Sequence, residues 1–162
     1  MAMSQPTQNN PGVVVIDANI FISICSKEPS EATAGAALAD YTARNWAFYA
    51  PSVILTEVLF ALCRKLYDGT IDAANHKKAV EDFNLSYLPA ISPPPMGDAA
   101  LYARAEEIRR GYSCLHSADG FYLALTEELA RSGPAEFLTF DKRVVNVAAN
   151  NAPTVKVYLL PS

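Results

Sequence analysis

Short apolar runs alternate along the chain with longer segments in which apolar side chains recur at helical spacing. The first run, Val13–Ile16, consists of four β-branched residues with no polar alternation. Such a run is typical of a strand buried on both faces, as in a parallel sheet covered by helices. Four further strands are expected at Trp46–Ala50, Ser86–Ile91, Ala135–Thr139 and Val155–Leu160. The pattern therefore predicts an α/β domain with a mainly parallel sheet of about five strands.

The segments between these strands carry helix signals, namely strong helix formers, apolar residues three and four positions apart, and capping or turn residues at the ends. The expected helices are Asn19–Arg44 with a break at Ser26–Ser30, Pro51–Tyr67, Ile71–Leu85, Asp98–Gly111, Ser117–Leu129 and Asp141–Ala149. Pro89 lies inside the predicted strand Ser86–Ile91 and cannot donate to a sheet ladder. That strand is therefore expected at an edge of the sheet.

Length and composition are those of one globular domain, since the chain has 162 residues and is 51% hydrophobic. Residues 1–12 are polar and contain two prolines, so we expect a flexible tail before a single domain over residues 13–162. The tail lacks the basic and apolar regions of a signal peptide, and the apolar runs are shorter than the roughly 20 residues that cross a bilayer. A soluble, cytoplasmic protein that binds no membrane is expected. The three cysteines lack zinc-type spacing and are expected to be reduced, mostly buried thiols.

Two aspartates come within two residues of the ends of predicted strands. Asp17 comes after Val13–Ile16, and Asp141 comes two residues after the strand that ends at Thr139. The carboxyl ends of parallel strands meet at one edge of the sheet, where α/β proteins bind their ligands. Taken alone, Asp17 fits equally well as the N-cap of the next helix, because Asp is a preferred N-cap residue.

Glu57 and Asp119 lie in predicted helices, and their neighbours three and four positions away are mainly apolar. A carboxylate that faces a sheet is costly to bury without a partner. One interpretation is local: Glu57 pairs with an arginine at the edge of the apolar stripe, and Asp119 is an ordinary first-turn residue favoured by the helix dipole. The other is that both acids enter one site with Asp17 and Asp141. The repetition of the pattern at four acids favours the shared site.

Such a site has a defined chemistry. Carboxylates gathered in one pocket repel one another, and a bound cation relieves that repulsion. Mg²⁺ prefers oxygen ligands and keeps positions for water and phosphate, and a metal-bound water can attack phosphorus. The net charge of −4 counts against a polynucleotide partner, although one divalent ion would change it to −4 + 2 = −2. The acids therefore predict hydrolysis of a phosphodiester.

The acids stand in four motifs, which are Asp17-Ala18-Asn19 after the first strand, Pro51-Ser52 followed by Thr56-Glu57-Val58, Ser117–Ala124, and Leu138–Arg143. In this order the motifs resemble those of PIN-domain nucleases of the kind found as VapC-type toxins of toxin–antitoxin pairs. The resemblance implies a three-layer α/β/α PIN-like domain and an endoribonuclease dependent on Mg²⁺ or Mn²⁺. Gly120 stands where the family usually has alanine, and Thr126 where a small apolar residue is common.

The resemblance and the positions of the acids also imply individual roles. Asp17 and Asp119 are the expected principal metal ligands, whereas Glu57 and Asp141 act through water or at a second metal ion. All four are candidate catalytic residues. Three polar residues are expected to hydrogen-bond metal-bound water or phosphate, each with a local capping role as an equally good alternative: Asn19, Ser117 and Thr139.

The expected partners are an RNA substrate, a cognate antitoxin and a second copy of the chain in a homodimer. Lys142 and Arg143 are the cations best placed for an RNA backbone, with Arg109 and Arg110 as further candidates. Two alternatives remain open. One is a catalytically inactive binding or scaffold module on the same fold. The other, a small-molecule phosphohydrolase, is weaker because no Gly-rich phosphate loop follows any predicted strand.

Overall fold

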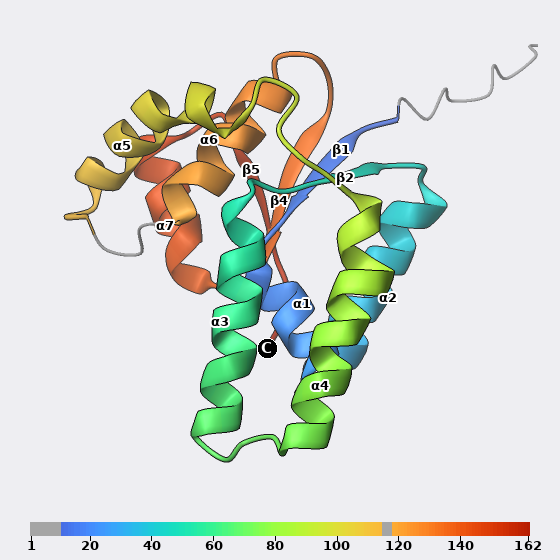
Figure 1. The fold of residues 1–162 in the computed structure, drawn as a ribbon. Coiled ribbons are helices and arrows are strands. Elements are labelled where there is room, and N and C mark those ends of the chain that lie inside the picture. Colours follow the sequence, from blue (N-terminus) through green and yellow to red (C-terminus); the bar gives the residue numbers. More distant parts are fainter. Residues whose placement is uncertain (1–10, 115–117) are drawn as a thin grey trace, which may run out of the picture.

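The computed structural model describes residues 11–114 and 118–162 (Figure 1). Most of the predicted tail and the predicted cap Ser117 lie outside these residues. The five strands are β1 (Val13–Ile16), β2 (Ala47–Tyr49), β3 (Ile91–Ser92), β4 (Ala135–Thr139) and β5 (Lys156–Leu159). They form one sheet in the order β3-β2-β1-β4-β5, and every adjacent pair is parallel. The predicted parallel α/β sheet is confirmed.

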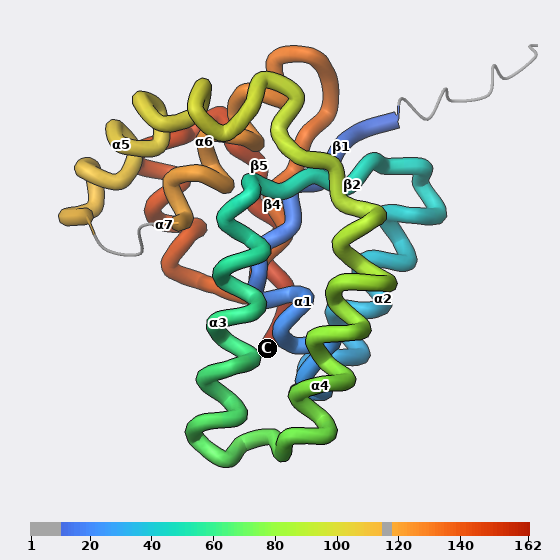
Figure 2. The backbone as a smooth tube through the Cα atoms, viewed as in Figure 1, coloured from blue at the N-terminus to red at the C-terminus, as the bar shows by residue number. Residues whose placement is uncertain are grey.

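Two groups of helices cover the sheet, giving the expected three layers (Figures 1 and 2). The first group contains α1 (Ala18–Cys25), α2 (Glu31–Ala43), α3 (Val53–Tyr67) and α4 (Ala73–Asp82). The second contains α5 (Tyr102–Gly111), α6 (Asp119–Leu129) and α7 (Lys142–Asn151). Within the second group, α6 packs on β1 and β4, and α7 packs on β5. In the described part of the chain, every helix falls short of the length or apolar character needed to cross a bilayer.

The central strand is β1, which pairs with β2 on one side and β4 on the other. Val14, Val15 and Ile16 are each 0% exposed. This complete burial explains why the run lacks polar alternation, because both of its faces are covered by helices. The strand therefore ends at a rigidly held position, and Asp17 is the next residue.

The strand predicted at Ser86–Ile91 is wrong over most of its length. The chain continues from α4 through a π-helical turn, η1 (Phe83–Tyr87), and a 3₁₀ turn, η2 (Leu88–Ala90), before the short strand β3. Phe83 and Tyr87 lie four residues apart and pack on the ring of Phe21, at centroid distances of 5.8 and 5.5 Å. Residues four apart lie on the same side of a helical turn, so the contact of both rings with Phe21 favours a helical conformation here. The edge position was predicted correctly, because β3 ends the sheet.

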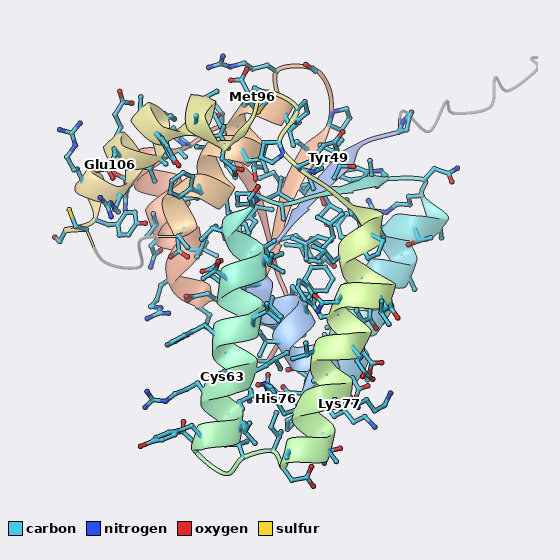
Figure 3. All side chains as sticks on the ribbon, in the orientation of Figure 1. Tyr49, Cys63, His76, Lys77, Met96 and Glu106 are labelled. Carbon is cyan, nitrogen blue, oxygen red and sulfur yellow. The ribbon has the colours of Figure 1, made fainter. Side chains whose placement is uncertain are left out.

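The thiols are free, but only Cys25 is buried. Cys63 lies exposed on α3 (Figure 3), and Cys114 is exposed after the end of α5. The expectation of mostly buried thiols is therefore wrong for two of the three.

Gly120 marks a close approach of α5 to α6. A Cβ atom at this position would lie 2.7 Å from the backbone oxygen of Ala105, closer than real Cβ contacts allow. The oxygen belongs to the α5 backbone, so relief would require a shift of the whole helix. This contact explains why glycine replaces the alanine that is usual in the PIN-like motif.

We therefore predict that Gly120→Ala lowers the free energy of unfolding by about 1–3 kcal/mol, because it overpacks the contact between α5 and α6. Gly35→Ala is the matched control, since a Cβ at Gly35 in α2 would meet nothing within 4 Å. Alanine there is expected to stabilise the helix by roughly 0.5–1 kcal/mol. Urea denaturation measures both changes, and an equal effect of the two substitutions would contradict the close approach.

Candidate active site

Asp17 lies at the carboxyl edge of the sheet, where β1 and β4 end side by side. Its side chain is the N-cap of α1, and it also accepts two side-chain hydrogen bonds at Oδ2, from Thr139 Oγ1 at 2.6 Å and from Asn19 Nδ2 at 2.8 Å. Only 9% of the residue is exposed. The capping interpretation of Asp17 is thus correct, and its role in a shared site stays a prediction.

Thr139 and Asn19 connect the two strand ends. Thr139 Oγ1 accepts hydrogen bonds from Asn19 Nδ2 at 3.1 Å and from the backbone N of Asp141 at 3.0 Å, while it donates to Asp17. Asn19 Oδ1 accepts from the backbone N of Phe140 at 3.3 Å. Both residues therefore hydrogen-bond to Asp17 itself. Their contact with metal-bound water or phosphate stays a prediction. The third predicted supporting residue, Ser117, lies outside the described residues.

Asp141 repeats the arrangement of Asp17. It is the N-cap of α7 and accepts a hydrogen bond from the backbone N of Arg143 at 2.9 Å. The Arg143 side chain turns back on the same carboxylate, with Nη2 at 2.6 Å from Oδ2. The first turn of α7 therefore presents a carboxylate and a guanidinium at this edge.

Glu57 projects from α3 and accepts a hydrogen bond at Oε2 from the hydroxyl of Tyr122, at 2.6 Å. The expected alternative, an arginine partner, is not what the structure shows. Tyr122 is a site residue that was not predicted from the sequence, although its position three residues after Asp119 places both side chains on one side of α6. That spacing was the available signal.

Burial and mutual repulsion raise the pKa values of three of the acids. Burial is the largest cause in each case and raises the pKa of Asp17 to about 6, of Glu57 to about 7 and of Asp119 to about 7. The negative charges of Asp17, Asp141 and Glu57, in that order, raise the pKa of Asp119 further. Hydrogen bonds from Thr139 and Asn19 oppose the shift at Asp17. Asp119 therefore lies within electrostatic reach of the other three predicted acids.

This arrangement can be compared with known proteins. The family model described as "PIN domain" matches residues 14–150 of the chain. The chain belongs to the PIN domain family. PIN domains are generally nucleases. A comparison with curated proteins found no match.

Two solved structures share the PIN fold of this chain. One is the structure of FitAB bound to an IR36 DNA fragment, with 18% identity, a TM-score of 0.60 and coverage of 91% of this chain and 94% of that chain. The other is the crystal structure of FitAcB from Neisseria gonorrhoeae, with 19% identity, a TM-score of 0.60 and coverage of 90% and 96%. At this level of identity the likeness concerns the fold.

The acids of this PIN domain are candidate ligands for a divalent ion. Among the described residues, no three His, Cys, Asp or Glu side chains already surround one point as metal ligands. Mg²⁺ is usually bound through one or two carboxylates with water in its other positions, so a preformed cage is not required. The donor set is all carboxylate and its charges repel, which is the chemistry that a hard divalent cation relieves. The residues present therefore fit such an ion.

The predicted RNA-binding cations lie on two helices. Lys142 and Arg143 are exposed in the first turn of α7. Arg109 and Arg110 lie in the last turn of α5, where Arg109 forms an ion pair with Glu106, which projects from that helix (Figure 3). The end of α5 lies near Asp119: burial and then the charge of Asp119 raise the pKa of Tyr112 to about 12.

The raised pKa values predict how stability depends on pH. An acid whose pKa is higher in the folded chain binds more protons when folded, so the free energy of unfolding falls as pH rises from the unfolded to the folded value. For Asp119 this window extends from its ordinary value of 3.8 to about 7. We predict that, in chelator-treated protein, the free energy of unfolding of Asp119→Asn falls by about 1–3 kcal/mol less over this pH window than that of the wild type.

Urea denaturation at pH 4 and at pH 8 measures this prediction. Glu81→Gln, which removes an exposed carboxylate on α4, is the control and should keep the pH dependence of the wild type. An Asp119→Asn variant that loses as much stability as the wild type over this window would show that burial and neighbouring charges do not raise the pKa of Asp119.

Proposed function

We propose that the protein is a metal-dependent endoribonuclease that hydrolyses RNA phosphodiester bonds, and that it acts as the VapC-type toxin of a toxin–antitoxin pair. The observation that carries the proposal is the convergence of acids from β1, α3, α6 and the β4–α7 junction on one sheet edge, where they raise one another's pKa values. A PIN domain with repelling carboxylates at this edge is suited to a divalent ion and a phosphate. The motif order in the sequence supports the toxin role.

In this proposal Asp17 and Asp119 hold a Mg²⁺ or Mn²⁺ ion directly. The ion, when bound, offsets charge on the phosphate and lowers the pKa of a coordinated water. Thr139 and Asn19 hold Asp17 Oδ2 by hydrogen bonds, which keeps that carboxylate ionised and oriented. Glu57 accepts a proton from the attacking water or orients that water.

Asp141 supports the site from the first turn of α7, through water or at a second metal position. Lys142 and Arg143 in the same turn bind the RNA backbone, because they are exposed cations beside the acidic edge. Arg109 and Arg110 extend this contact from the end of α5. On the basis of its motif alone, Ser117 is proposed to hydrogen-bond metal-bound water or phosphate.

A cognate antitoxin and a homodimer are proposed as the protein partners. The VapC-type motifs support both. The exposed aromatic side chains of α3 are consistent with a protein contact, since Phe60 is 69% and Tyr67 is 85% exposed.

The test is cleavage of RNA by the purified protein with and without Mg²⁺. Asp17→Asn is expected to reduce metal-dependent cleavage by about a hundredfold or more, because it removes a ligand charge while Asn still caps the helix. Asp72→Asn is the matched control. Asp72 is the N-cap of α4 and accepts a backbone hydrogen bond from Asn75, so it shares the capping role of Asp17 but not its site.

Cleavage that survives excess chelator, or that Asp17→Asn leaves at the level of Asp72→Asn, would contradict the proposal. Absence of any cleavage together with absence of Mn²⁺ binding would instead favour the inactive scaffold module.

A further inference from the structure

Tyr122 belongs to α6 and is 0% exposed. Its hydroxyl donates to Glu57 Oε2 at 2.6 Å. Its ring stacks on Phe137 of β4, with the ring centroids 5.6 Å apart and the planes inclined by 24°. The side chain is therefore fixed at both ends, by packing at the ring and by a charge-assisted hydrogen bond at the hydroxyl.

This bond restrains a flexible acid. Glutamate has three side-chain torsions, so an unrestrained Glu57 on α3 would have several positions for its carboxylate. The Tyr122 hydroxyl selects one of them and engages Oε2, which leaves Oε1 as the oxygen for a water or an ion. Tyr122 and Asp119 both belong to α6, three residues apart, so one helix supplies a carboxylate and also orients the carboxylate that comes from α3.

Resting on the proposed nuclease function, we propose that Tyr122 is a positioning residue of the site, whose hydroxyl holds the Glu57 carboxylate in place and thereby strengthens the binding of the divalent ion. Tyr122 itself touches neither metal nor substrate. Groups that hydrogen-bond to metal-site carboxylates in this way generally affect metal affinity by about tenfold or more.

The chain contains a matched control for this bond. Tyr41 in α2 is 1% exposed, and its hydroxyl donates to Oε2 of Glu136 at the same distance, 2.6 Å. Glu136 is near the start of β4, at the opposite end of that strand from Thr139, and forms an ion pair with Lys156. Tyr41→Phe and Tyr122→Phe thus each remove a hydrogen bond of the same length from a buried tyrosine to a glutamate, but only Tyr122 belongs to the acidic site.

The experiment is a calorimetric titration of full-length protein with Mn²⁺, accompanied by thermal denaturation. Both Phe variants are expected to lower Tm. Tyr122→Phe is expected to raise the Kd for Mn²⁺ about tenfold, and Tyr41→Phe is expected to leave it unchanged. In a Glu57→Gln background, Tyr122→Phe should have no further effect on Kd, because the hydroxyl acts through Glu57.

An unchanged Kd in Tyr122→Phe, or an equal rise in both Phe variants, overturns the positioning role. These results leave the proposed function intact provided that the wild type binds Mn²⁺ and Asp17→Asn does not. Failure of the wild type to bind Mn²⁺ overturns both proposals.

If Tyr122→Phe does not fold, ¹⁹F NMR of wild-type protein labelled with 3-fluorotyrosine provides the test. The resonance that moves in Glu57→Gln identifies Tyr122, and the proposal requires that the same resonance shifts when Mg²⁺ is added. A resonance that does not respond to Mg²⁺ overturns the proposal.

Discussion

The hydrogen bond from the Thr139 hydroxyl to Asp17 connects the carboxyl ends of the two central strands, and the arrangement of the acidic site depends on it. Through the same oxygen, Thr139 also accepts from Asn19 and from the backbone N of Asp141. One hydroxyl thus sets the relative positions of two N-capping aspartates, each at the start of a different helix. Because β1 is buried on both faces, this connection is anchored in the rigid centre of the sheet.

The acids that surround this bond are held at a cost in stability. Burial and mutual repulsion raise the pKa values of Asp17, Glu57 and Asp119, so each is less favourable as a carboxylate here than in water. The fold compensates only in part, with hydrogen bonds from Thr139, Asn19 and Tyr122. An arrangement that is unfavourable without a cation and relieved by one is expected of a binding site rather than of a stabilising core.

The central strand and the positions of the acids could be predicted from the sequence, because buried segments have recognisable patterns of apolar residues. The unbroken apolar run Val13–Ile16 located the central strand and with it Asp17, and apolar neighbours at helical spacing identified Glu57 and Asp119. Hydrogen-bond partners that lie far apart in the chain have no such pattern in the sequence. The partner of Glu57 is Tyr122, 65 residues away, rather than the arginine that was considered.

Two other features could not be predicted from the sequence, because they depend on tertiary contacts. The segment Ser86–Ile91 has the composition of a strand but is mostly helical, because Phe83 and Tyr87 pack on Phe21. Gly120 is a departure from the motif that the sequence does not explain, and only the approach of α5 shows that a side chain there would collide with the backbone of Ala105.

The central claim is that Asp17 and Asp119 bind a divalent cation at the sheet edge. The most direct test is a crystal structure of the protein soaked in Mn²⁺, with the ion located by its anomalous scattering. The claim predicts a peak within coordination distance, about 2.0–2.3 Å, of carboxylate oxygens from both residues. A map without a peak at this edge, at a Mn²⁺ concentration that saturates binding in solution, would contradict it.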